Sequence, residues 1–409
     1  MMNLSNIVDC GGISMSRRLY GKLNLSEIYQ ISLFIMCTNY LISQIYCFSN
    51  NETFDFINRF LSLISYILLI FIIYNNFRNL KIRWVKYIVF VSIIALIGIE
   101  NAQSTGVMKY FLLTIAASNI NYSKIVNTLL YSFTSVTVFS FFLYLFGFSA
   151  PYRMEENAIS FGFVHPNVTS LVIITICFLW LSKKNTVKSK ELFALLFVFL
   201  EIFFLQKSKV ASIVLIVLPI LFLVVKKCCL EKYRICKYFA EFTQLFVFFI
   251  TVILIVVYPL TIYDRFRNVI DSMFTYRPYL NFNNVMQYGV TLWGRNIDIF
   301  NKTDYAYNYY LGYVSNKKYN TVDCAYVIGL INIGIIPMAI MFICYIKMIN
   351  KAWQNCNYMV ITISILFAIY GFIENGTNEW FYFFTYFYLL ANDDISYKTI
   401  YKRGKINDT

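Results

Sequence analysis

Long apolar stretches alternate with short polar or charged breaks along the whole chain. There are about twelve of these stretches, and most are roughly as long as the ~20 apolar residues that a helix needs to cross a hydrocarbon core of about 30 Å. The pattern predicts an all-α polytopic membrane protein that forms a single integral membrane domain over residues 1–409. The predicted spans are 28–47, 60–76, 87–99, 107–118, 125–148, 163–181, 191–206, 210–225, 243–262, 324–346, 358–373 and 379–391.

The positive charges are divided unequally between the two sides of this arrangement. With the N-terminus placed inside, about two thirds of the 35 Lys and Arg residues fall in inside segments, as the positive-inside rule requires. Most of the others lie in one long loop, residues 263–323, and the rule does not constrain long loops. We therefore predict that both termini are cytoplasmic. Residues 263–323 are expected to form a large extracellular loop, with short amphipathic helices around 263–275 and 283–293.

Composition supports the same class and excludes several others. Hydrophobic residues make up 59% of the 409 positions and charged residues 14%, and the mean hydropathy is +0.60. A soluble domain carries about 25% charged residues, so an ordinary cytosolic protein, a disordered chain and a nucleic-acid-binding protein are excluded. The ten cysteines form no C-x-x-C pair and His165 is the single histidine, which argues against a zinc site.

Two polar segments stand at the predicted outer ends of spans. The first contains Arg153 and continues into Gly162-Phe163-Val164-His165-Pro166-Asn167, where proline suits the first turn of a helix and asparagine can cap it. This segment is either a plain helix start or a place where His165 takes part in chemistry, because an imidazole is costly to keep idle at a membrane boundary. The second is a tight turn with Lys207 and Lys209, whose ammonium groups either snorkel to the interface or bind an anion.

The long outer loop is rich in arginine, tyrosine and asparagine. It contains Arg277 and Arg295 and runs into Asp323-Cys324-Ala325-Tyr326, where the tenth span begins. A guanidinium offers forked donors that match phosphate oxygens, and Tyr and Asn side chains stack on sugars and hydrogen-bond them, so a phosphorylated, sugar-bearing ligand fits this loop. Glu374, at the end of the eleventh span, is either the partner of one of these arginines or a helix-end charge.

This ordered set of motifs resembles the O-antigen ligase and polymerase superfamily, and within it the Wzy-type polymerases of capsular and exopolysaccharide pathways. The resemblance rests on Arg153 before the motif 162–167, the basic turn Ser208-Lys209, Arg277 followed by Trp293-Gly294, and the stretch 323–326 before a span with Gly329 and Gly334. Two positions depart from the family pattern. Cys324 stands where asparagine is expected, and Lys209 stands where arginine is expected.

The resemblance implies a multi-span bundle of the GT-C-like glycosyltransferase class. Such an enzyme is metal-independent, needs no cofactor and is a multi-pass protein of the bacterial cytoplasmic membrane. It takes glycan from a polyprenyl-pyrophosphate-linked oligosaccharide and lengthens a polymer on the outer face. The expected partners are this lipid-linked substrate, membrane lipid, and the flippase and chain-length regulator of the same pathway, with no nucleic acid among them.

The resemblance also implies roles for individual residues. Arg277 would stabilise the pyrophosphate leaving group, because preorganised cations lower the barrier where negative charge develops. Asp323 is the first candidate for the general base that deprotonates the acceptor hydroxyl, and His165 is the alternative. The other residues expected to bind substrate or pyrophosphate are Arg153, Lys207, Lys209, Arg295, Tyr326 and Glu374.

Two other functions stay open at this point. An O-antigen-type ligase shares the lipid carrier and the architecture, and differs only in its acceptor. A flippase or transporter for lipid-linked oligosaccharides belongs to a different class and is expected to place charges inside its spans, where this chain has few besides Glu201. The dominant outer loop therefore favours the polymerase.

Overall fold

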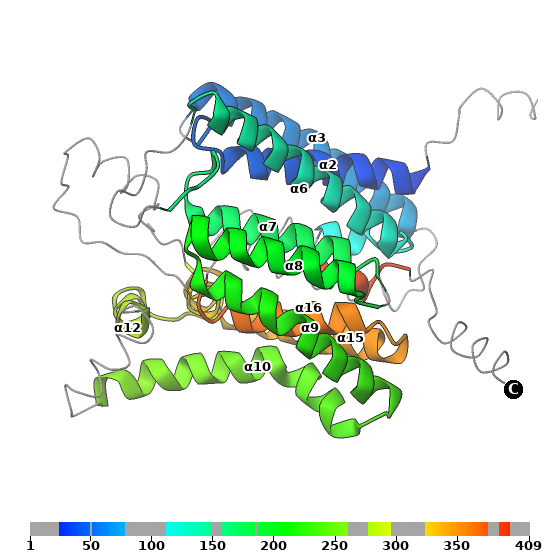
Figure 1. The fold of residues 1–409 in the computed structure, drawn as a ribbon, viewed down its shortest axis with the longest axis vertical. Coiled ribbons are helices and arrows are strands. Elements are labelled where there is room, and N and C mark those ends of the chain that lie inside the picture. Colours follow the sequence, from blue (N-terminus) through cyan, green and yellow to red (C-terminus); the bar gives the residue numbers. More distant parts are fainter. Residues whose placement is uncertain are drawn as a thin grey trace, which may run out of the picture.

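The computed structural model describes residues 24–49, 51–77, 112–148, 158–184, 186–260, 277–295, 324–374 and 384–392. Within these ranges the chain is almost entirely helical, and no β-strand occurs among them. Figure 1 shows most of the helices side by side in one bundle, with their axes roughly aligned. The prediction of an all-α protein is confirmed for the described part of the chain.

The described elements follow the apolar stretches of the sequence closely. For example, the ends of the predicted spans 28–47, 125–148 and 358–373 lie within a few residues of the ends of the observed helices. In chain order the elements are α2 (Leu25–Ser43), α3 (Glu52–Phe77), α6 (Tyr122–Leu145), α7 (Pro166–Leu181), α8 (Ser189–Glu201), η1 (Ile202–Gln206), α9 (Lys209–Leu230), α10 (Arg234–Val257), η2 (Tyr258–Leu260), α12 (Arg277–Tyr288), α14 (Ala325–Ile328), η3 (Gly329–Ile333), α15 (Ile335–Gln354), α16 (Tyr358–Tyr370) and η5 (Phe384–Leu389).

Five described helices are long and apolar enough to cross a membrane, and between 17% and 39% of the apolar window of each is buried inside the bundle. Most of their apolar surface therefore faces outward, which a water-soluble protein rarely allows over large patches. The protein is a helical membrane protein. The predicted span 87–99 lies outside the described residues, so the number of twelve spans stays a prediction. The five helices are Glu52–Asn76, Tyr122–Leu145, Lys209–Leu230, Arg234–Val257 and Ile335–Gln354.

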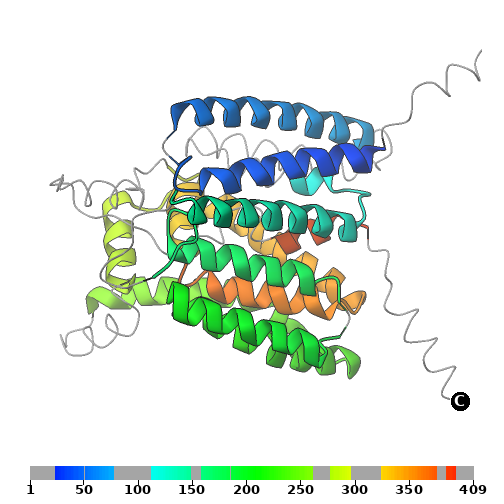
Figure 2. The same cartoon turned by 45° about the horizontal axis from the view of Figure 1, so that its top comes forward.

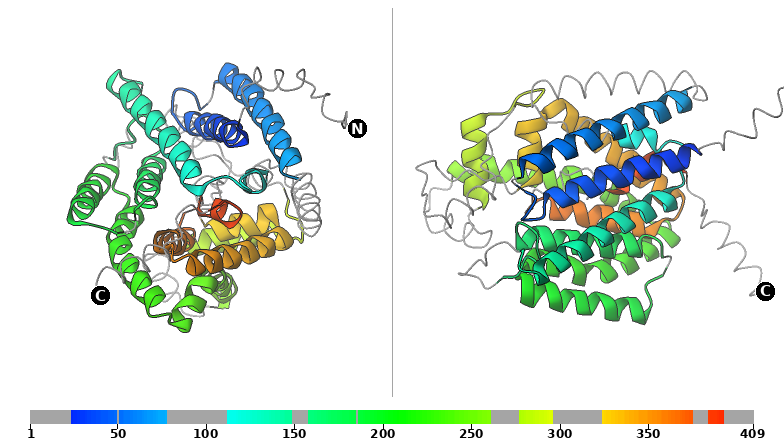
Figure 3. Two further views of the ribbon diagram at one scale, coloured as in Figure 1. Left: turned by 90° about the vertical axis from the view of Figure 1, so that its right-hand side faces the viewer. Right: turned by 90° about the horizontal axis from the view of Figure 1, so that it is seen from above.

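One large core and one smaller core hold the bundle together. The large core joins α2, α6, α7, α9 and α16 with η5, and Figure 3 shows η5 near the middle of the bundle when viewed along the helices. The end of η5 is fixed by Lys351 of α15, whose Nζ donates to the carbonyl oxygens of Tyr388 (2.8 Å) and Ala391 (2.6 Å). The smaller core contains Val247, Tyr326 and Phe342 and lies between α10, α14 and α15.

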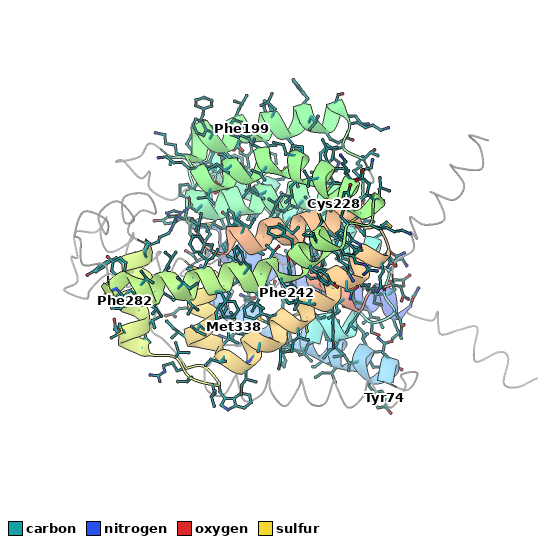
Figure 4. All side chains as sticks on the ribbon, turned by 90° about the horizontal axis from the view of Figure 1, so that it is seen from below. Tyr74, Phe199, Cys228, Phe242, Phe282 and Met338 are labelled. Carbon is teal, nitrogen blue, oxygen red and sulfur yellow. The ribbon has the colours of Figure 1, made fainter. Side chains whose placement is uncertain are left out.

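The described loops gather at opposite ends of the bundle. We call one of them the α12 end, because α12 lies there beyond the long helices (Figure 2). Figure 4 shows Phe282 on α12 at this end and Cys228, near the end of α9, at the other. The segments at the α12 end lie in the loops that the sequence places outside or at the adjoining ends of predicted spans, although their side of the membrane stays a prediction. They are residues 44–49, 158–165, 207–208, 289–295 and 371–374.

Helix α12 crosses the end of the bundle rather than following its axis (Figures 1 and 3). It docks on Tyr258 of η2, whose ring centroid lies 6.2 Å from that of Tyr279 and 5.6 Å from that of Phe282. The expected helix around 283–293 is corrected to Arg277–Tyr288, because Gly289 takes a left-handed conformation (φ +68°) that ends the helix. The expected helix at 263–275 lies outside the described residues.

Candidate functional site

The segment before α7 is fitted against the ends of two other helices. Gly162 has φ +89°, and a Cβ at this position would overlap the carbonyl oxygen of Ser140 on α6, so another residue does not fit. Ser140 also donates from its Oγ to the carbonyl oxygen of Phe161 (2.9 Å). Phe163 is fully buried and forms an antiparallel bridge with Ile45, just after α2. These contacts fix the backbone that leads into His165.

His165 caps α7. Its Nδ1 accepts a hydrogen bond from the backbone N–H of Asn167 (3.1 Å), and Pro166 is the first helical residue, as the sequence predicts. The expectation that Asn167 supplies the cap is corrected, because the ring of His165 already occupies that place. With Nδ1 as the acceptor, the neutral imidazole carries its proton on Nε2. The side chain of Asn167 points instead toward Glu374.

Glu374 joins three segments that are far apart in the sequence. Its Oε1 accepts from Nη2 of Arg277 at 2.8 Å and from Nδ2 of Asn167 at 3.3 Å. The side chain of Arg277 is 17% exposed and that of Glu374 is 10% exposed, so the ion pair is largely removed from solvent. The sequence left open whether Glu374 is a partner of an arginine or a helix-end charge. The structure shows that it is the partner of Arg277.

Arg277 also lines a small pocket between α10, α12 and the turn that follows α16. The empty space is about 340 Å³, counting the part open to solvent. Arg277 supplies the charge in this lining, two other residues are polar and the rest are apolar. The lining residues are Thr251, Leu254, Ile255, Arg277, Pro278, Asn281, Phe372 and Ile373. A ligand that is anionic at one point and apolar around it matches this arrangement.

The basic turn after α8 rests on a buried network of side chains. Lys207 (φ +54°) and Lys209 are exposed, whereas Gln206, the last residue of the π-helix η1, is 2% exposed. Ser170 of α7 donates to Oε1 of Gln206 (3.1 Å), and Nε2 of Gln206 donates to the carboxylate of Glu201. The network therefore ties the turn with the two lysines to α7, one turn and a half after His165.

Arg295 follows a segment that is fixed to η3. The backbone N–H of Arg295 donates to the carbonyl oxygen of Ile331 (3.0 Å), and a Cβ on Gly294 would overlap the carbonyl oxygen of Asn332. The two backbones can approach this closely only because Gly294 lacks a side chain. Arg295 itself is exposed. The structure thus holds its backbone at the α12 end, and a Cβ on Gly289 would lie 4.0 Å from Nη2 of its guanidinium.

Cys324 and Tyr326 pack α14 against α16. Sγ of Cys324 lies 3.7 Å from the carbonyl oxygen of Gly371, which also accepts from the backbone N–H of Ala325 (2.8 Å). Tyr326 is 5% exposed, and its hydroxyl donates to the carbonyl oxygen of Ala368 (2.7 Å). We expected Tyr326 to bind substrate. Its buried side chain packs within the smaller core, and the substrate-binding role stays a prediction.

The structure connects some of the expected site residues through hydrogen bonds and places others at the same end of the bundle. Arg277, Glu374 and His165 are connected through Asn167, and the turn with Lys207 and Lys209 is connected to α7 through Gln206. Arg153 and Asp323 lie outside the described residues. The sequence did not single out Asn281 and Thr251 of the pocket. The helical spacing of four between Arg277 and Asn281 is the signal that could have revealed Asn281.

The geometry of the α12 end suits the binding of an anionic, lipid-attached ligand. A largely buried arginine is held by a carboxylate beside a mostly apolar pocket, and further cations lie at the same end of the bundle. No protein-family model, curated protein sequence or solved structure matches this chain.

Proposed function

We propose that the protein is a polysaccharide polymerase that joins polyprenyl-pyrophosphate-linked repeat units on the outer face of the bacterial cytoplasmic membrane. The observation that carries this proposal is the Arg277–Glu374 pair, which lies beside an apolar pocket at one end of a membrane-embedded bundle. A lipid pyrophosphate needs both features, because its headgroup is anionic and its chain is apolar. The resemblance of the sequence motifs to Wzy-type polymerases supports the same class.

In the proposed reaction, an acceptor hydroxyl oxygen attacks the anomeric carbon of the donor sugar while the bond from that carbon to the pyrophosphate oxygen breaks. The electron pair of this bond leaves with the pyrophosphate, so negative charge develops there. Arg277 is oriented by Glu374 and can stabilise this charge without further reorganisation. Arg295, Lys207 and Lys209 add positive potential at the same end.

The proton of the acceptor hydroxyl passes to a general base. His165 is poorly prepared for this role in the described geometry, because its Nδ1 already accepts from Asn167 and the neutral ring carries a proton on Nε2. This supports Asp323 as the base, and it gives His165 the role of fixing the start of α7.

The distribution of buried carboxylates supports an enzyme over a transporter. Glu191 and Glu241 are buried but lie in the third of their helices nearest the end opposite α12, where they pair with Lys184 (3.7 Å) and Lys237 (3.4 Å). Glu201 lies beside the basic turn and is bound by Gln206. A flippase is expected to line a central cavity with charge, whereas the charges described here gather at the two ends.

The proposal predicts that Arg277→Lys abolishes most polymer formation. Lysine keeps the charge, but its single ammonium group cannot hold Glu374 and a phosphate in the forked geometry of a guanidinium. We expect polymer to fall at least about 10-fold, equivalent to roughly 1.4 kcal/mol of transition-state stabilisation. The measurement is a size-resolved glycan profile of a gene-deletion strain that expresses each variant, together with its extracted lipid-linked intermediates. Arg59→Lys, an exposed arginine of α3, is the matched control.

The same profile distinguishes the competing functions. Single repeat units that accumulate on the outer face of the deletion strain would establish polymerisation. Finished polymer that stays on the lipid carrier would indicate a ligase, and repeat units confined to the inner face would indicate a flippase. Polymer at the level of the unaltered protein in the Arg277→Lys strain would remove Arg277 from the site.

A further inference from the structure

Helix α12 presents a second polar side chain to the Arg277 pocket. Asn281 follows Arg277 by four residues, so both lie on one face of the helix, and both line the pocket. Asn281 is 7% exposed, and its Oδ1 is buried with no hydrogen-bond partner among the described residues. A buried carbonyl oxygen that meets no donor destabilises a fold, so its presence requires an explanation.

The polar groups of the pocket divide into a donor and an acceptor. Arg277 offers N–H donors and no acceptor. The hydroxyl of Thr251 is already engaged by the carbonyl oxygen of Val247 (2.9 Å) and by Cys324, so Oδ1 of Asn281 is the acceptor in this lining that has no partner among the described residues. The complementary ligand carries a negatively charged oxygen and, close to it, a hydroxyl that donates. A pyrophosphate alone supplies only the first of these.

We propose that Asn281 binds a hydroxyl of the sugar that is bonded to the pyrophosphate while Arg277 binds the phosphate. The inference rests on the proposed function and names the residue that determines specificity within it. The donor, with its sugar attached, satisfies both Arg277 and Asn281. The spent carrier, polyprenyl pyrophosphate without sugar, satisfies Arg277 alone, so the pocket favours the loaded lipid over the spent one.

The dimensions of the pocket agree with this assignment. The enclosed space of the pocket is about 20 Å³, which is roughly the room that one water-sized group needs. It admits a single hydroxyl group beside the phosphate and leaves the sugar ring and the rest of the repeat unit at its open side. The apolar residues Leu254 and Ile255 of α10 line the same pocket, next to outward-facing α10 side chains such as Val256, which is 58% exposed.

The test is Asn281→Leu in the purified full-length protein, reconstituted in lipid nanodiscs. Two probes are used: the lipid-linked repeat unit extracted from the gene-deletion strain, and polyprenyl pyrophosphate without sugar. We expect Asn281→Leu to weaken binding of the repeat-unit lipid about 10-fold, the loss typical of one specific hydrogen bond, and to leave binding of the sugar-free lipid within twofold. Arg277→Leu weakens both. Met286→Leu, at an exposed position of α12, changes neither.

The outcomes separate this inference from the function on which it rests. The role of Asn281 is overturned if the Asn281→Leu variant binds both lipids like the unaltered protein, or if its affinity for both lipids falls equally. Arg277 keeps its role in either case. An unaltered protein that binds neither lipid contradicts the proposed function itself. Thermal unfolding provides a second readout, because leucine keeps the branched shape of asparagine and removes the unmatched acceptor. The midpoint is expected to stay level or rise, and a clear drop would show a structural role and overturn the inference.

Discussion

At the scale of single residues, one carboxylate organises the α12 end. Glu374 connects Arg277 of α12 with Asn167 of α7, so the position of the cation depends on residues more than 90 positions apart. The sequence indicates the types of residue at the site. Arginine, histidine and glutamate cost free energy at a membrane boundary unless they are paired or take part in function. The sequence does not indicate which of them pair, since pairing depends on how distant helices pack.

Removing Glu374 is expected to destabilise the protein. Glu374→Ala leaves a guanidinium with little exposure and without its counter-charge, and breaking such a buried pair costs about 3 kcal/mol. Glu374→Gln should lose less, because its amide oxygen still accepts from Arg277 and Asn167. Glu27→Ala removes an exposed carboxylate in the first turn of α2 and should cost less than about 1 kcal/mol. Denaturant unfolding in detergent micelles measures all three. Equal losses for Glu374→Ala and Glu27→Ala would contradict the described ion pair.

At the scale of elements, apolar pattern predicts the long helices and fails at their irregular ends. Helices such as α6 and α16 appear where the sequence places them, because length and hydropathy are local properties. The π-helix η1 forms the end of the seventh predicted span, and η3 interrupts the tenth. Such π-segments are frequent at functional sites, but they depend on neighbouring segments that accept or donate the displaced hydrogen bonds. The position of α12 is likewise set by its docking on η2, which no local pattern records.

The connection between α6 and α7 contains two glycines that form a matched pair for testing how the start of α7 is fixed. Gly147 and Gly162 both have positive φ, at +86° and +89°, but a Cβ at Gly147 meets nothing within 4 Å whereas one at Gly162 overlaps the carbonyl oxygen of Ser140. Alanine at Gly147 should cost about 1 kcal/mol from backbone strain alone. Alanine at Gly162 should cost clearly more and should lower activity, because it displaces the backbone that leads to His165. Unfolding midpoints and polymer levels measured together check this. Equal effects at the two positions would refute the described contact with α6.

At the scale of the whole molecule, the described helices form a membrane-embedded bundle with different chemistry at its two ends. The α12 end combines a buried arginine–carboxylate pair, a pocket and exposed cations, whereas the opposite end holds pairs such as Lys237 with Glu241. The positive-inside rule predicts that the α12 end faces outside, and sequence alone could supply that orientation because it depends on charge counts. The meeting of α7, α12 and the turn after α16 at this end depends on tertiary packing, which charge counts do not contain.

Polymer synthesis by the purified protein is the most direct test of the proposed function. The full-length chain would be reconstituted in liposomes with the lipid-linked repeat unit extracted from the deletion strain, without nucleotide or added metal, and the products would be resolved by size. We predict a ladder of products that lengthens with time, releases sugar-free polyprenyl pyrophosphate, and falls at least about 10-fold with Arg277→Lys. Repeat units that bind but stay single, with no carrier released, would contradict the assignment of this protein as a polymerase.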